Sequence, residues 1–135
     1  MRLLGDFEVR RGTLLRRSAE VVVRSERGVE WGTVLCPATA RTSEYLGNTR
    51  SNSGRILRTA TSEDRRTRSE TAEREKQFFG QAAAMISERF VKMQLIDIEQ
   101  IFGGERLILY YLSEGRVDFR ELVKGMAREF NMRIE

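Results

Sequence analysis

The sequence predicts an α+β protein with a mainly antiparallel sheet and two helices. The elements follow the β-α-β-β-α-β order of the split βαβ (ferredoxin-like) arrangement, preceded by extra N-terminal strands. Three observations lead to this class. Apolar and polar residues alternate early in the chain, Gly103-Gly104 separates two strand-like runs, and two later segments carry apolar residues at helical spacing. We expect one domain, composed of an N-terminal β-ribbon (1–36), a polar loop (37–55) and an αββαβ unit (56–135).

The ribbon begins with a half-buried strand, because Leu3, Phe7 and Val9 alternate with polar residues. Two β-rich runs follow at 21–24 and 29–35, and the residues Ser-Glu-Arg-Gly between them predict an antiparallel hairpin. Trp31 shares a face with apolar neighbours in the second run, so we interpret it as a core residue rather than a platform for stacked bases.

The polar loop has no periodicity and is rich in Ser, Thr and Asn. A loop this long in a small domain is usually functional or mobile. A short strand around Ile56-Leu57 is expected to end it.

The first long helix is predicted to begin after Thr61, which is placed as its cap and is followed by acidic residues. Nearly every residue from Asp64 to Gln77 is polar, so this half is expected to project from the domain. The second half is expected to pack on the sheet through the apolar residues Phe79, Ala82, Ala83, Ile86 and Phe90.

The last helix has the clearest predicted start. Asp118 is placed as the cap, Glu121 completes a capping box, and Val117 and Leu122 are spaced to form a hydrophobic staple. The apolar stripe of this helix is Phe119, Leu122, Val123, Met126, Ala127 and Phe130, and a short strand at 132–134 follows.

The composition excludes several functions. The 135 residues include no histidine and a single cysteine, Cys36. No internal disulfide can form, and the usual ligands of zinc and iron–sulfur clusters are missing. The commonest general base is absent too. We therefore expect a cytoplasmic, non-enzymatic protein without a metal or cofactor, and without a membrane span, since no apolar run is long enough.

Positive charge is concentrated in residues 1–58, which hold 11 arginines against 6 acidic residues. Six arginines are candidates for contact with a nucleic-acid backbone: Arg24, Arg27, Arg41, Arg50, Arg55 and Arg58. Arginine is also abundant in proteins from GC-rich genomes, and this explanation has at least equal weight.

The polar half of the long helix is the second candidate surface. Its charges nearly cancel, which suits another protein better than RNA, although such a face is most often only solvated. The candidate partner-binding residues are Arg65, Arg66, Arg68, Glu70 and Glu73.

Three blocks of sequence carry a resemblance to a known family. Residues 23–34 read VRSERGVEWGTV, residues 56–61 read ILRTAT, and residues 115–123 read GRVDFRELV. These blocks are similar to those of the PSP-type (polymerase-suppressor) C-terminal domain family. The family-motif residues are Arg27, Gly28, Glu30, Gly32, Arg116, Val117, Asp118, Phe119 and Arg120.

The resemblance implies a regulatory role exerted by binding protein partners. Bacterial members are linked to mRNA processing and developmental regulation, in one case through a complex with two small helical proteins that modulates a ribonuclease. Some eukaryotic relatives are implicated in RNA binding. Members of this kind continue into a cysteine-bearing segment implicated in an iron–sulfur cluster. The printed sequence ends at Glu135, so the resemblance carries no cluster over.

Two interpretations of the 115–120 block remain open. Arg116 and Arg120 flank a helix N-terminus, where backbone N–H groups favour an anion such as phosphate. Alternatively, the block only sets the angle of the last helix, with both arginines paired to nearby carboxylates. We favour the structural interpretation, because Asp118 already occupies part of the site.

Overall fold

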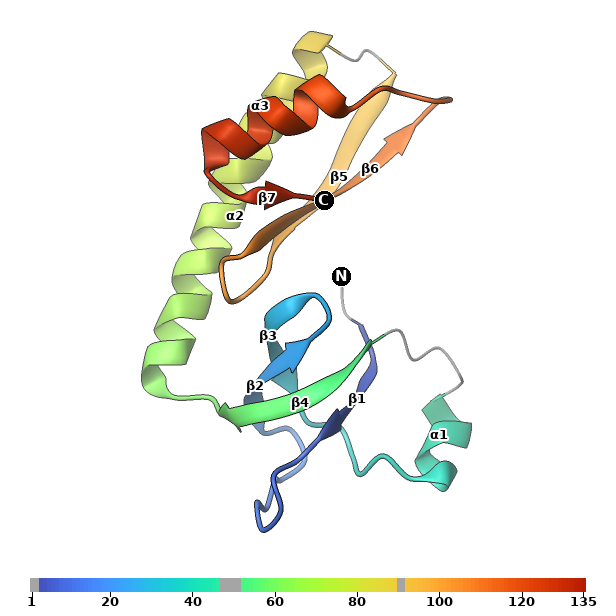
Figure 1. Ribbon diagram of the computed structural model, residues 1–135, viewed down its shortest axis with the longest axis vertical. Coiled ribbons are helices and arrows are strands. Elements are labelled where there is room, and N and C mark those ends of the chain that lie inside the picture. The colour runs from blue at the N-terminus through green and yellow to red at the C-terminus, as the bar shows by residue number, and fades with distance from the viewer. Residues whose placement is uncertain (1–2, 47–51, 90–91) are drawn as a thin grey trace. The chain divides into compact units, whose positions relative to one another are not determined.

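The computed structural model describes residues 3–46, 52–89 and 92–135. The chain divides into two units, Met1–Arg65 and Arg66–Glu135, each with its own sheet (Figure 1). Helix α2 (Ser62–Arg89) begins in the first unit and continues through the second. The expectation of a single folding domain stays a prediction.

The first unit contains a four-stranded sheet of order β1-β4-β2-β3. Its strands are β1 (Gly5–Glu8), β2 (Glu20–Ser25), β3 (Gly28–Thr33) and β4 (Asn52–Thr59). Strand β2 is antiparallel to β3 and β4, whereas β1 is parallel to β4. The predicted hairpin at 21–35 is confirmed, and Gly28 ends its turn at a φ of 130°, which favours glycine.

Strand β2 is the centre of this unit. Val21, Val22 and Val23 are 2%, 0% and 4% exposed, so both faces of the strand are buried. Next to it, β4 contains a bulge at Leu57, because Val23 pairs with Ile56 and Val22 with Arg58. At Gly54 the two backbones come so close that a Cβ atom would overlap the carbonyl oxygen of Arg24.

The predicted polar loop at 37–55 is wrong in two respects. It contains helix α1 (Ala40–Leu46), and strand β4 begins inside it at Asn52. The helix is stabilised locally by a reciprocal cap. The Thr42 backbone N–H donates to Thr39 Oγ1 at 3.3 Å, and the Thr39 N–H lies 2.9 Å from Thr42 Oγ1. The threonines that suggested a loop therefore cap a helix.

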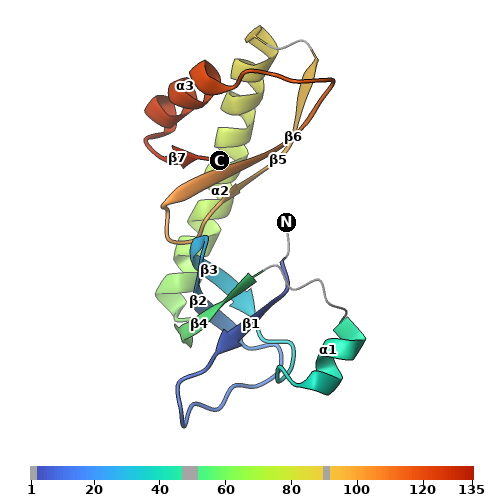
Figure 2. The same ribbon diagram turned by 45° about the vertical axis from the view of Figure 1, so that its right-hand side comes forward.

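The second unit places α2 and α3 (Arg120–Phe130) on one face of a three-stranded sheet (Figure 2). The sheet has the order β5-β6-β7, with β5 (Met93–Gln100), β6 (Arg106–Ser113) and β7 (Arg133–Ile134). Strands β5 and β6 form the predicted hairpin at Gly103-Gly104, and Gly104 has a φ of 75°. The predicted short strand at 132–134 is confirmed as β7, parallel to β6.

The core of the second unit is formed by both helices and the sheet. Its buried residues are Ala82, Ile86, Leu95, Ile98, Leu107, Leu122, Met126 and Phe130. The predicted apolar faces of both helices are therefore confirmed, with Phe79, Ala83 and Phe119 packed at the margin. Phe90 lies outside the described residues.

The α+β class is confirmed, but the finer description needs three corrections. The described residues form three helices rather than two. Each sheet contains one parallel pair, so both sheets are mixed. From β4 onward the elements follow the predicted order β-α-β-β-α-β. A ferredoxin-like sheet is nevertheless not confirmed, because β4 belongs to the first sheet and not to the sheet of β5, β6 and β7. Strand β4 pairs with β1 and β2, so neither of its edges is open to the C-terminal strands.

The predicted start of α3 is also wrong by one residue. Phe119 is the N-cap, and no side chain caps it. Asp118 precedes the cap and accepts the Arg120 backbone N–H at 3.1 Å. Glu121 pairs with Lys124 at 3.1 Å, so it does not complete a box with Asp118. At the other end, Asn131 closes the helix in the left-handed conformation (φ 51°).

Candidate functional site

The start of α2 is stabilised by Asp64, a buried residue that is 7% exposed. The Asp64 N–H donates to Thr61 Oγ1 at 3.1 Å, and the Thr61 N–H donates to Asp64 Oδ2 at 2.9 Å. This is a reciprocal capping box, which confirms Thr61 as the cap. Arg58 donates to the same carboxylate from Nε (3.0 Å) and Nη2 (2.7 Å). These hydrogen bonds, with that of Arg58 the strongest, hold the pKa of Asp64 well below its usual range.

The six predicted nucleic-acid arginines are not gathered into one uncompensated patch. Arg58 is engaged by Asp64, and Arg27 lies 3.5 Å from Glu30. Arg41 lies on α1, and Arg50 falls outside the described residues. Arg24 on β2 and Arg55 on β4 are direct cross-strand partners. The structure records no ion pair between either of these two and a described carboxylate.

The five predicted partner-binding residues are all exposed on α2. Arg65 pairs with Glu20 at 3.0 Å in the first unit. Arg66 and Glu70 approach to 3.9 Å, and Lys76 donates to Glu73 at 2.8 Å. These four side chains are between 62% and 73% exposed, and we call Arg66, Glu70, Glu73 and Lys76 the charged face. Arg68 is exposed on the same helix.

A polar stripe on α2 escaped the sequence analysis. The less exposed residues of the helix recur at helical spacing along its whole length: Asp64, Thr67, Thr71, Glu75, Phe78, Ala82 and Ile86. Glu75 accepts the Gln100 backbone N–H at 2.7 Å, and burial raises the pKa of this carboxyl group. The polar half of α2 is therefore partly engaged, and only its other face is fully exposed. Counting Thr67 and Thr71 together with the apolar residues would have extended the periodicity of Phe78, Ala82 and Ile86 towards the start of the helix, but no such count selects Asp64 or Glu75.

The N-terminal family motif shapes the β2–β3 hairpin. The Ser25 hydroxyl donates to Glu30, which also pairs with Arg27. Gly32 lies beside Val21 and Val23, since its Cβ would be 3.5 and 3.6 Å from their methyl groups.

The C-terminal family motif leads into α3. Arg120 Nη2 lies 2.8 Å from Asp118 Oδ2, and the Phe119 and Tyr111 rings pack with centroids 4.8 Å apart. Arg120 is therefore paired with a nearby carboxylate, as the structural interpretation of the 115–120 block expects. Arg116 is exposed.

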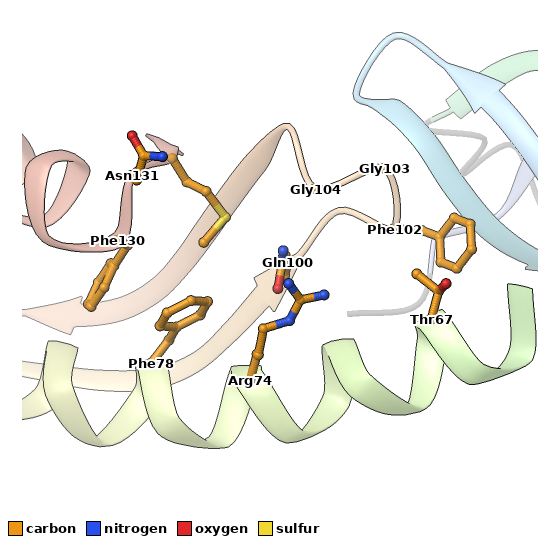
Figure 3. A pocket seen from close by; sticks show the side chains of 10 residues that line it. Thr67, Arg74, Phe78, Gln100, Phe102, Gly103, Gly104, Phe130 and Asn131 are labelled. Carbon is orange, nitrogen blue, oxygen red and sulfur yellow. The ribbon is translucent and has the colours of Figure 1, made fainter. Parts of the chain in front are cut away.

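One pocket in the second unit contains residues that sequence analysis did not select. It has a volume of about 390 Å³ and lies between α2, the 101–105 turn and the residues that follow α3 (Figure 3). We call it the Gln100 pocket. It is lined by Thr67, Arg74, Phe78, Gln100, Phe102, Gly103, Gly104, Phe130, Asn131 and Met132.

The described ranges contain neither a helix suited to cross a membrane nor a group of metal-ligating side chains. None of the described helices is long and apolar enough to cross a membrane. Among residues 3–46, 52–89 and 92–135, no three His, Cys, Asp or Glu side chains are grouped to hold a metal ion. The absence of a metal in the protein stays a prediction.

Comparison with known proteins defines the family. Residues 54–135 match the model of the PSP1 C-terminal conserved region, and this match covers more than half of the chain. The chain belongs to this family, which confirms the resemblance found in the sequence.

A named relative is the Stage 0 sporulation protein YaaT of Bacillus subtilis (strain 168). It is 33% identical to this chain over 115 residues, which cover 85% of the chain. The aligned region spans 41% of the relative's length. No solved structure matches the chain significantly.

Proposed function

We propose that this chain is a non-enzymatic regulatory adaptor that binds a protein partner through the charged face of α2. We further propose that it acts in a complex of the kind linked to mRNA processing or developmental regulation. The similarity to a sporulation protein supports the regulatory role. The observation that carries the binding proposal is the charged face itself, which is more than 60% exposed on a helix of 28 residues.

The energetics of the charged face favour docking. Exposed ion pairs contribute only about 0–1 kcal/mol each, so the helix does not depend on them. They can exchange partners when a second protein approaches, at little cost to the fold. The face carries both signs of charge, which suits a complementary protein surface and opposes a continuous phosphate backbone.

A second function, RNA binding, has one specific observation in its favour. Arg24 and Arg55 lie directly opposite one another on neighbouring strands, and like charges in this position destabilise a sheet. A phosphate group bound between the two guanidinium groups would offset this repulsion. The proposal of protein binding ranks first, because Arg27 and Arg58 already have carboxylate partners.

The two functions are separated by capture from a cell lysate, with and without nuclease. The first variant swaps the charges of the α2 face (Arg66→Glu, Glu70→Arg, Glu73→Lys, Lys76→Glu). It keeps the net charge and both side-chain pairs, so helix stability is expected to stay the same. The second variant is Arg24→Glu with Arg55→Glu, which leaves the Arg58–Asp64 pair intact.

We expect the α2 charge-swap variant to lose a protein that wild type retains after nuclease treatment. The captured protein is identified by mass spectrometry and then bound in purified form. If the charge-swap variant binds everything that wild type binds, while the arginine variant loses RNA, the RNA-binding function replaces the first proposal.

A further inference from the structure

The Gln100 pocket is lined by a residue with a buried polar atom that has no partner in the described part of the chain. Gln100 is 7% exposed, and its Oε1 atom is buried with no hydrogen-bond donor among the described residues. The residue is held in place at the end of β5, because its backbone N–H donates to Glu75 Oε1 at 2.7 Å. A buried carbonyl without a donor costs free energy, and a ligand that supplies a donor would recover it.

A cation lies beside this carboxamide. Arg74 projects from α2 towards Gln100 in Figure 3. It contacts Thr71 Oγ1 through a long hydrogen bond of 3.4 Å. The structure records no ion pair between Arg74 and any carboxylate of the described residues. Its guanidinium group is therefore available to an anion, and its planar donors suit a phosphate group.

Aromatic side chains form much of the remaining wall. Phe78 and Phe130 pack together with ring centroids 4.9 Å apart, and Phe102 lines the far side of the pocket (Figure 3). Gly103 and Gly104 place only backbone at the mouth. Phenylalanine rings offer flat apolar surfaces to a heteroaromatic ring.

These three features together define one class of ligand. A carboxamide pairs with the donor and acceptor on the edge of a base, aromatic rings contact its face, and a guanidinium group binds its phosphate. We propose that the Gln100 pocket binds a nucleotide, with adenine as the preferred base. Because Gln100 Oε1 has almost no accessible surface without a ligand, the carboxamide turns toward the pocket on binding. The adenine amino group then donates to Gln100 Oε1, N7 accepts from Gln100 Nε2, and the phosphate contacts Arg74.

The same chemistry is present in a free nucleotide and in an unpaired nucleotide of RNA. The site adjoins the charged face, because Arg74 lies beside Glu70 and Glu73 on α2, but none of the four residues of the charged face lines the Gln100 pocket. If the chain acts as the proposed adaptor, binding of a free nucleotide or of RNA at this pocket would allow that ligand to regulate it.

The test uses the full chain in equilibrium titrations with AMP, adenosine, UMP, and short oligoadenylate and oligouridylate strands. Gln100→Leu removes the carboxamide at similar volume, and Arg74→Gln removes the cation from an exposed position. Arg89→Gln, on the same helix outside the pocket, is the matched control. Circular dichroism establishes that each variant is folded.

We expect Gln100→Leu to weaken adenine-ligand binding at least tenfold and Arg89→Gln to leave it unchanged. Arg74→Gln should weaken AMP but not adenosine, which lacks the phosphate. Binding of AMP identifies a free nucleotide as sufficient, whereas binding of oligoadenylate alone identifies RNA as the source.

Three results would overturn the proposal. They are the absence of saturable binding by any of the five ligands, equal affinity for adenine and uracil ligands, and wild-type affinity in both pocket variants. Should Gln100→Leu fail to fold, the contrast between AMP and adenosine in Arg74→Gln decides by itself.

Discussion

Replacing Asp64 by alanine is expected to be the most informative single perturbation of the first unit. The change removes the carboxylate that accepts the Thr61 N–H and breaks the bidentate pair with Arg58, whereas the backbone N–H of position 64 can still donate to Thr61 Oγ1. The Thr61 N–H then loses its acceptor, and the guanidinium group of Arg58 is left without its carboxylate.

The magnitude follows from these contacts. Loss of the hydrogen bond from the Thr61 N–H costs about 1 kcal/mol, within a range of about 0.5–1.5. The hydrogen bonds to Arg58 would contribute about 1.5–3 kcal/mol if they were fully buried. Arg58 is 49% exposed, however, and water can replace part of this interaction, so we reduce its contribution to about 1 kcal/mol. The expected loss in the free energy of unfolding is therefore about 2 kcal/mol.

Urea unfolding of wild type, Asp64→Ala, Arg58→Ala and the double variant measures this loss. The pair shares hydrogen bonds, so the double variant should lose less than the sum of the two single losses. Glu63→Ala, an exposed neighbour in the same turn, serves as the control and should cost less than about 1 kcal/mol. A loss for Asp64→Ala no larger than that for Glu63→Ala would refute the assignment.

The low pKa of Asp64 adds a pH signature. Its folded-state pKa lies below the unfolded value of about 3.9, so the stabilisation is complete above that pH and declines as the pH falls further. The difference in stability between wild type and Asp64→Asn should therefore shrink on acidification from pH 6 to pH 2. A difference that stays constant over this range would contradict the pairing.

Three further predictions concern stability. Glu75→Gln keeps an acceptor for the Gln100 N–H but removes a charge whose burial raises the pKa of Glu75. The variant should be more stable than wild type at pH 7, and the gain should disappear once the pH falls below the pKa of Glu75 in the unfolded chain. A lower stability of the variant at pH 7 would show that the Glu75 charge does not destabilise the fold. Gly54→Ala should prevent pairing of β2 with β4, because the new Cβ would overlap the Arg24 carbonyl group, and soluble protein with an unchanged urea midpoint would exclude that close approach. Gly80→Ala, with open space at its Cβ in the middle of α2, should instead stabilise by about 0.5–1 kcal/mol in urea unfolding; a loss of stability would show that the helix is not regular there.

Elements with strong local signals could be predicted from the sequence. The apolar periodicity of α3 and of the second half of α2 identified buried faces that the structure confirms. The two hairpins were predictable because turn residues separate short β-rich runs. Thr61 was predictable as a cap because its role depends only on residues within the first turn.

Other features depend on contacts that a local pattern does not contain. Strand β4 joins β1 and β2 through pairings distant in sequence, which a linear element order does not reveal. Helix α1 was missed because Thr39 and Thr42 have low helix propensity inside a helix but cap one effectively. The cap of α3 shifted because Asp118 bonds Arg120 instead of the helix interior.

In the candidate site, too, the sequence identified individual residues but not the long-range contacts that bring them together. Arg58 and Asp64 were both noted in the sequence, yet their pairing depends on how β4 enters α2. Gln100 and Arg74 are far apart in the chain and come together only because β5 packs against α2. No spacing rule joins them, so the pocket could not be predicted.

The most direct measurement of partner docking through the charged face of α2 is the association rate with the purified captured protein. Surface plasmon resonance compares wild type, the α2 charge-swap variant, and a control swap (Glu88→Arg with Arg89→Glu) near the end of the same helix. Charges at the rim of an interface act mainly on association. We predict at least a tenfold slower association for the α2 charge-swap variant and no change for the control swap, with equal thermal stability in all three proteins. Equal association and dissociation rates for wild type and the α2 charge-swap variant would contradict the proposed docking surface.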